Sequence, residues 1–138
     1  MIEFFFERVH RVLLVRYAAE LTQADFQELD SLLADFVACE GTADTVIDFS
    51  NIRGRVEVAD LVKRARETKP SVMAACRRVL VAPRDAVFGM MRAYSTHLEL
   101  KGEACPHVVR SIAEAYHLLE LEKPHFEPYA ATRRTAAR

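Results

Sequence analysis

The chain has 138 residues, which fits one domain, and 51% of them are hydrophobic, which is enough for a full core. The 19 lysines and arginines oppose 20 acidic residues, so the formal net charge is −1 and the basic excess of a duplex-binding protein is missing. We therefore expect no nucleic-acid partner. No apolar run approaches the ~20 residues of a membrane span, so we also expect no membrane span and a cytoplasmic protein.

Two apolar segments open the chain. Residues 2 to 7 alternate in character, with Ile2, Phe4 and Phe6 on one predicted face. Residues 10 to 17 are rich in valine and leucine. The connection between the two segments is short enough for an antiparallel hairpin.

A helix is expected from Thr22, because Asp25 three positions later gives a near capping box. The apolar residues that follow recur at helical spacing and predict one buried stripe: Phe26, Leu29, Leu32, Leu33, Phe36 and Val37. Gly41 ends this helix. A strand is expected over residues 45 to 49, and a second helix over residues 57 to 69, just before a proline.

The second half of the chain continues this alternation. A strand is expected over residues 78 to 82, then a helix that Asp85 can cap, and then a short strand over residues 107 to 110. Ser111 and Glu114 form a capping box for a final helix.

The predicted order is β-β-α-β-α-β-α-β-α, which indicates an α/β fold. Its mixed sheet is mainly parallel, with right-handed crossovers and an antiparallel hairpin at the N-terminus. We expect Ile47, Leu80 and Val108 on adjacent buried strands. Residues 1 to 122 are predicted to form the domain and residues 123 to 138 a C-terminal tail. Something is expected to hold this tail, with Phe126 and Tyr129 lying on the body or on a neighbouring chain.

No catalytic pattern is found in the sequence. A G-x-S-x-G elbow is missing, the glycines are too scattered for a nucleotide loop, and the histidines form no H-x-x-x-H or H-E-x-x-H pair. Cys39, Cys76 and Cys105 form no C-x-x-C pair, so we expect buried or inert thiols. We therefore expect neither catalysis nor a metal or cofactor.

The segment from Val46 to Val62 is the most informative part of the chain. An apolar strand runs into Asp48 and Ser50, the chain turns at Gly54, and a helix is expected near Glu57. Arg53 and Arg55 flank the turn before this helix start, where free amides and the helix dipole favour an anion. Two interpretations stay open: the arginines bind an anion, or Glu57 satisfies the helix start and the arginines are solvated.

A second segment, residues 83 to 94, indicates an interface. Val87, Phe88, Met90 and Met91 make this helix apolar nearly all round, more than one face can bury against a single sheet. Gly89 lies inside the same helix, where glycine costs about 1 kcal/mol relative to alanine. It suggests close approach by another backbone, either of the sheet or of a partner. Core packing alone is the alternative.

The element order and the sequence Val46-Ile47-Asp48-Phe49-Ser50 before a loop and helix together resemble the STAS fold. This fold is shared by anti-sigma-factor antagonists and sulfate-transporter tails, and the likeness is closest to stand-alone bacterial SpoIIAA-like proteins. It covers residues 2 to 121. In signalling members a serine at the start of the second helix is phosphorylated to release a kinase. The matching position here falls on Glu57 or Val58, so the phosphoacceptor is absent.

The resemblance implies a cytoplasmic, non-catalytic regulatory domain that binds a protein partner. We expect the binding surface, for a partner or an anion, to include Asp48, Ser50, Arg53, Arg55, Glu57, Arg84, Phe88 and Met91. The competing interpretation is a carrier or sensor of a small apolar or anionic ligand, because lipid-transfer (CRAL-TRIO) domains have a distantly similar architecture. The apolar surplus at residues 87 to 91 and the aromatic residues of the tail also suggest a symmetric homodimer.

Overall fold

The computed structural model describes residues 2–54, 73 and 75–129, and every structural statement below concerns these residues. In chain order, the elements are β1 (Ile2–Glu7), β2 (Val12–Ala19), α1 (Gln23–Glu40), β3 (Asp44–Ile52), β4 (Arg78–Val81), α3 (Asp85–Leu100), β5 (His107–Val109), α4 (Ile112–Leu118) and β6 (Glu127–Pro128). The helix expected over residues 57 to 69 lies outside the described residues.

The described strands form one mixed sheet in the order β5-β4-β3-β2-β1-β6. Strands β2 to β5 run parallel to one another, while β1 runs antiparallel to both β2 and β6. The predicted α/β fold with an opening hairpin is confirmed at this level. Ile47 pairs with Leu80 and Leu80 with Val108 in the sheet register, so the three residues lie side by side as predicted.

Strand β3 is longer than the sequence suggests. Instead of ending at residue 49 it continues to Ile52, because Asn51 and Ile52 still pair with the end of β2. The Ile52 side chain is buried, which gives the extra pairing an apolar anchor. Ser50 therefore lies inside the strand, as the predicted bounds already had Asp48.

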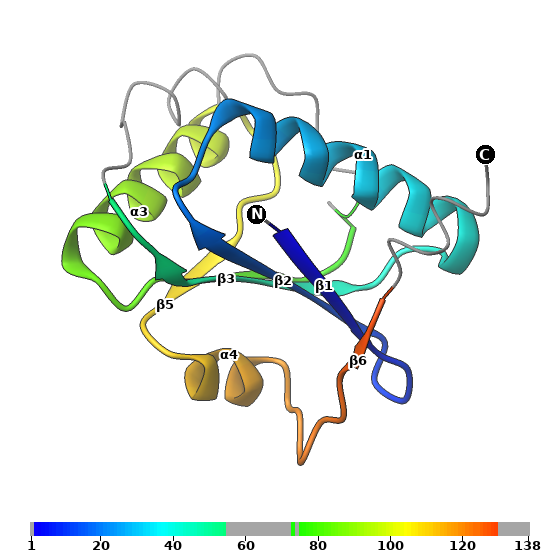
Figure 1. Cartoon of the computed structure of the whole chain (residues 1–138). Helices are drawn as coiled ribbons and strands as arrows, with labels where there is room; N and C mark the ends of the chain where they lie inside the picture. The colour runs from blue at the N-terminus through cyan, green and yellow to red at the C-terminus, as the bar shows by residue number, and fades with distance from the viewer. Residues whose placement is uncertain (1, 55–72, 74, 130–138) are drawn as a thin grey trace.

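Helices cover both faces of the sheet: α1 and α3 lie on one side and α4 on the other (Figure 1). The larger core lies under α1 and α3, where the predicted stripe of α1 meets alternate residues of the hairpin. It includes Phe4, Phe6, Leu13, Val15 and Tyr17 of the hairpin and Phe26, Leu29, Leu33 and Phe36 of α1. The smaller core joins Val12, Leu14, Val46, Val79 and Val81 to Ala115, Leu119 and Leu121.

Both ends of α1 are fixed by polar contacts. The capping box is confirmed, since the Asp25 N–H donates to Thr22 Oγ1 at 3.3 Å and the Thr22 N–H donates to Asp25 Oδ2 at 2.9 Å. At the other end Arg11 Nη2 donates to the carbonyl of Glu40 at 2.6 Å and to that of Thr42 at 3.1 Å. This arginine of the hairpin supplies the positive charge that the last turn of α1 lacks.

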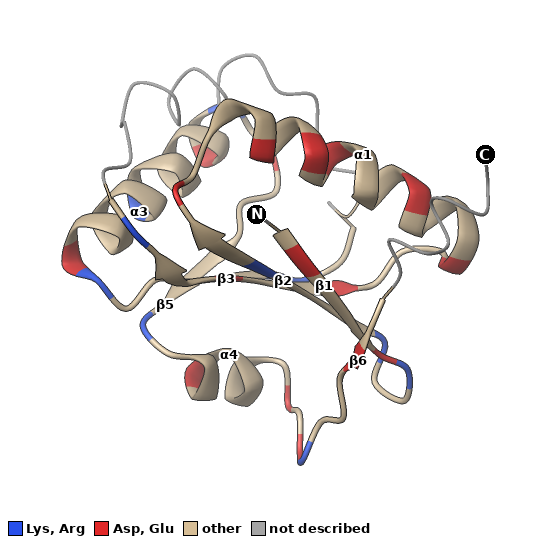
Figure 2. Cartoon of the chain, viewed as in Figure 1, with Lys and Arg blue, Asp and Glu red and all other residues tan. Residues whose placement is uncertain are grey.

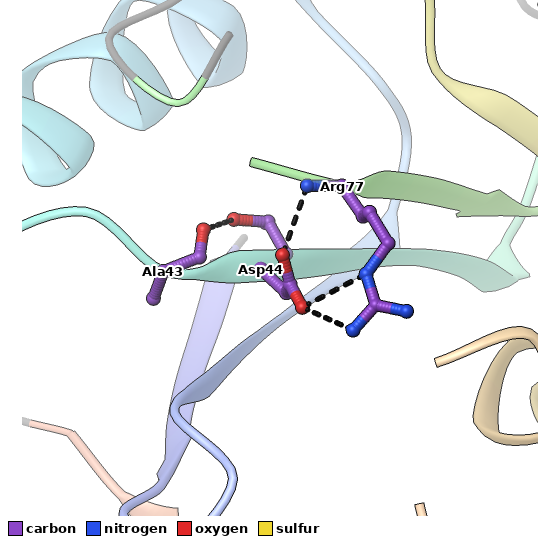
Figure 3. Close-up of polar contacts among 4 residues, drawn as sticks. Ala43, Asp44 and Arg77 are labelled. Atoms are coloured by element: carbon purple, nitrogen blue, oxygen red, sulfur yellow. Dashed lines mark hydrogen bonds and ion pairs between the residues drawn. The ribbon is translucent and has the colours of Figure 1, made fainter. Parts of the chain in front are cut away.

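At the amino end of β3 an aspartate links two strands. Asp44 accepts the backbone N–H of Arg77 at 2.9 Å and the same residue's Nη2 at 2.9 Å (Figure 3). The contact joins β3 to the residue just before β4, so it helps to fix the register of these strands.

The start of α3 differs from the prediction. The N-cap is Arg84, which makes no capping hydrogen bond with its side chain, and Asp85 is the first helical residue. The Asp85 carboxylate instead contacts Arg110 Nη1 at 2.5 Å. The expected side-chain cap is wrong, because the Asp85 carboxylate is taken by the ion pair with Arg110, 25 residues later in the chain.

The predicted tail lies on the body as far as residue 129. Strand β6 pairs with Phe5 and Phe6 at the edge of the sheet, one strand beyond the predicted order. The Tyr129 ring packs edge-on against Phe36 at 5.1 Å, and Phe126 stacks on Tyr116 at 5.9 Å. The sheet therefore extends past residue 122.

Glu7 is a buried acid at the turn of the hairpin, only 3% exposed. Its carboxylate accepts the His10 N–H at 2.7 Å and lies 2.8 Å from His10 Nδ1. Burial alone would raise the pKa of Glu7. The hydrogen bonds from the backbone and ring of His10, its charge and the Val9 N–H outweigh this effect, so the pKa lies below its ordinary value of 4.5.

We predict that Glu7→Gln lowers the free energy of unfolding at neutral pH by about 1–3 kcal/mol, because the charged acceptor is lost. A depressed folded-state pKa contributes stability that is present above the unfolded-state value near 4.5 and lost as pH falls through the folded-state value. Urea unfolding at neutral pH and at about pH 3 should show the difference between variant and wild type shrinking in acid. A difference that stays constant over this range would contradict the assignment.

Candidate partner-binding surface

Arginines follow three neighbouring parallel strands at their carboxyl ends. Arg53 follows β3, Arg84 follows β4 and Arg110 follows β5, and these strands are consecutive in the sheet. Loops at the carboxyl ends of parallel strands meet at one edge and commonly form binding sites. Figure 2 shows basic positions there, where β3 ends, at the start of α3 and between β5 and α4. We call Arg53, Arg84, Arg110, Phe88 and Arg92 the strand-end surface.

Two of the loops are tied together by backbone acceptors. Arg84 Nη1 donates to the carbonyl of Ile52 at 3.3 Å, which brings this guanidinium to the residue before Arg53. The Arg53 N–H donates to the carbonyl of Ala19 at 2.9 Å and holds its own loop against the end of β2. Gly54 follows with φ +79°, a conformation that favours glycine and lets the chain turn away from the sheet.

Phe88 forms the apolar centre of the strand-end surface. The guanidinium carbon of Arg110 lies 3.8 Å from the centre of its ring, and that of Arg92 lies at 6.0 Å. Arg110 Nη1 also approaches the carbonyl of Pro83 at 3.4 Å, in addition to Asp85. These contacts hold Arg110 against an aromatic face, the arrangement of a cation–π pair.

Asp48 and Ser50 do not join these arginines. Asp48 is 5% exposed, shares the α4 side of β3 with Val46, and accepts the Ser50 N–H at 2.9 Å and the Ser50 hydroxyl at 2.5 Å. Arg16 Nε approaches the same carboxylate at 3.4 Å from the neighbouring strand. The Asp48 carboxylate is therefore not exposed with the strand-end arginines; it lies on the face of the sheet, where it holds Arg16 and Ser50.

Tyr116 of α4 lies near this buried pair. Burial raises the pKa of its phenol, and the negative charge of Asp48 acts in the same direction while Arg16 opposes it. The Arg16 guanidinium also lies 5.4 Å from the ring centre of Phe5. Arg16, Asp48 and Tyr116 thus form a polar cluster within the fold. The sequence did not predict the role of Arg16, because its partner Asp48 lies 32 residues away.

Met91 is not on the surface either. It is 2% exposed and lies with Val87 in the larger core, while Phe88 and Met90 are half-buried at its margin. Core packing thus accounts for much of the apolar surplus that suggested a homodimer. At Gly89 a Cβ would meet nothing within 4 Å, so the expected close approach of the sheet is also wrong.

Arg55 and Glu57 lie outside the described residues, so the expected carboxylate at a helix start stays a prediction.

Arg110 and Arg92 of the strand-end surface were not predicted from the sequence. The signal that could have found Arg110 is its position at the end of the last predicted strand, because the carboxyl ends of parallel strands meet at one edge of a sheet. The thiols of Cys39 and Cys105 are exposed, contrary to the expectation of burial.

Comparison with known protein families and with curated protein sequences finds no match for this chain. Within residues 2–54, 73 and 75–129, no helix is both long and apolar enough to cross a membrane. The same residues contain no group of three or more histidine, cysteine, aspartate or glutamate side chains placed to hold a metal ion.

Proposed function

We propose that this chain is a non-catalytic regulatory domain that binds a protein partner through the strand-end surface. The observation that carries the proposal is the set of arginines at three consecutive strand ends, one of which, Arg110, packs on the half-buried ring of Phe88. Arginine and aromatic residues are enriched at protein interfaces and dominate their binding energy.

The contacts of these arginines support a binding role. Arg84 and Arg110 are positioned by backbone carbonyls and by Phe88, so less side-chain entropy is lost when a partner binds. Arginines at the opposite end of the sheet are already engaged in the fold, since Arg77 holds Asp44 and Arg11 holds the end of α1. The strand-end side chains of Arg84 and Arg110 are exposed.

The resemblance of residues 46 to 50 to STAS domains of anti-sigma-factor antagonists points to the same class of function. The mixed sheet with its opening hairpin is compatible with that resemblance. Because the position of the phosphoacceptor falls on Glu57 or Val58, we propose a domain held in one binding state without a kinase-controlled switch. Its compartment, by the same reasoning, is the cytoplasm.

The test is affinity capture from an extract of the source organism with the wild-type chain and with Arg53→Glu/Arg84→Glu. We expect one saturable protein partner on the wild type and a loss of at least about tenfold in capture by the variant, because two interfacial charges are reversed. The matched control is Arg8→Glu/Lys123→Glu, which changes the net charge equally at exposed residues elsewhere. This control should capture the partner as the wild type does.

Circular dichroism of each variant confirms that it is folded before capture is compared. Equal capture by wild type and Arg53→Glu/Arg84→Glu would contradict the proposed surface. Native mass spectrometry of the purified chain tests the competing carrier function. A stoichiometric small apolar or anionic molecule that remains bound, with no protein captured, would favour the carrier.

A further inference from the structure

We propose that the strand-end surface recognises a run of carboxylates, so that the partner presents an acidic, extended segment to it. This inference rests on the proposed function and names the chemistry of the partner. Its first support is charge: among the described residues, Arg53, Arg84, Arg92 and Arg110 outnumber the acids at the same strand ends, Glu20, Asp85 and Glu114.

The cations of this surface are all arginines. A guanidinium presents a planar fork of donors that matches a carboxylate through two parallel hydrogen bonds, which the ammonium of lysine cannot do. Arg110 already makes a single charge-assisted contact with a carboxylate of the chain, because its Nη1 lies 2.5 Å from Asp85 Oδ1. The Asp85 side chain is 95% exposed, so a carboxylate from a partner can replace it without uncovering a buried charge.

The spacing of the arginines favours an extended ligand. Neighbouring strands lie about 4.8 Å apart, so Arg53 and Arg110, which follow strands two places apart, emerge about 10 Å from each other. At this spacing each arginine can take its own carboxylate. Alternate side chains of an extended peptide are about 7 Å apart on one face, and two acidic side chains with this spacing can reach both arginines.

The charges of the rest of the chain argue for a narrow segment over a broad polyanion. Helix α1 lies on the same side of the sheet as α3 and contains neither lysine nor arginine (Figures 1 and 2). Its acidic residues are Asp25, Glu28, Asp30, Asp35 and Glu40. An anionic membrane surface would meet this negative helix as well as the arginines, whereas a single peptide need not approach it.

The probe for the test is a fluorescein-labelled hexaglutamate peptide, followed by anisotropy, with hexaglutamine as the uncharged control peptide. We expect the wild-type chain to bind hexaglutamate and not hexaglutamine, and the binding to weaken between about 50 and 300 mM salt. Arg84→Gln/Arg110→Gln should weaken binding by about tenfold or more, because two charge-assisted contacts are lost. The control Arg8→Gln/Lys123→Gln removes the same charge elsewhere and should change binding by less than about twofold.

A third variant separates the arginine fork from charge alone. Arg84→Lys/Arg110→Lys keeps both charges, and we expect its affinity to fall between that of the wild type and that of the glutamine variant. If the lysine variant binds hexaglutamate as tightly as the wild type does, the proposed role of the guanidinium fork is wrong. If the glutamine variant binds hexaglutamate as tightly as the wild type does, the whole inference is wrong.

Two other occupants are tested with the same proteins. Tighter, Arg84- and Arg110-dependent binding to vesicles containing about one-third phosphatidylserine would replace the peptide with a membrane and overturn the inference. Light scattering that shows salt-sensitive self-association through these arginines, with no hexaglutamate binding, would also overturn the inference.

The two proposals can fail separately. If hexaglutamate does not bind but the protein capture above still depends on Arg53 and Arg84, the proposed acidic chemistry of the partner is wrong and the proposed function stands. If hexaglutamate binds and no protein is captured, the proposed function fails.

Discussion

Replacing Phe36 with alanine is expected to lower the free energy of unfolding by about 3–5 kcal/mol, one of the two largest effects of a single change. The side chain is 1% exposed and lies between two other rings, with Phe6 at 5.0 Å and Tyr129 at 5.1 Å between ring centroids. Its removal opens a cavity at the point where α1, the hairpin and the segment after β6 meet.

Urea unfolding measures this loss, and Phe36→Leu is the matched control. Leucine fills part of the space, so its loss should be clearly smaller than that of alanine. The alanine variant should also release the segment that carries Tyr129, which limited proteolysis after β6 can detect. A loss below about 1 kcal/mol for Phe36→Ala would mean that the three rings do not form a common core.

Replacing Asp48 with asparagine is expected to lower the free energy of unfolding by about 2–3 kcal/mol. The carboxylate is buried, accepts two hydrogen bonds from Ser50 and faces Arg16, which would lose its counter-charge. The estimate stays below that of a fully buried ion pair, because the Arg16 side chain is 33% exposed.

Asp85→Asn is the control for this prediction, because it makes the same chemical change at an aspartate that is 95% exposed. It should change stability by less than about 0.5 kcal/mol, as expected for a surface contact. Partner capture by Asp48→Asn should equal that of the wild type once folding is complete. Equal stability losses at the two positions, or lost capture with a stable fold, would return Asp48 to the binding surface.

Local signals predicted much of this fold from the sequence. Alternation in β1, the helical stripe of α1 and the capping box at Thr22 depend on residues only a few positions apart, and the structure contains all three. At Ser111 half of the predicted box is present: the Ser111 hydroxyl accepts the Glu114 N–H at 3.1 Å, whereas the Glu114 carboxylate accepts the Arg110 N–H at 3.5 Å. The register of Ile47, Leu80 and Val108 also agreed, since buried parallel strands appear as continuous apolar runs.

The remaining features depend on contacts between distant residues. Strand β3 continues to Ile52 because the end of β2 pairs with it. The burial of Asp48 depends on Arg16 of β2, which lies 32 residues away in the sequence. Strand β6 has two residues, too few to give any periodic signal, and exists because β1 offers an open edge. Arg110 enters the strand-end surface through Phe88 and Asp85, both more than 20 residues away in sequence.

The most direct test of the proposed binding surface is to map the backbone amides of the chain that change when the captured partner protein is added, using two-dimensional NMR. We predict that the perturbed amides cluster at the carboxyl ends of β3, β4 and β5, around Arg53, Arg84 and Arg110. The amides of the hairpin turn and the exposed side of α1 should remain unchanged. Perturbations confined to α1 or to the α4 face, with the strand ends unaffected, would contradict the account.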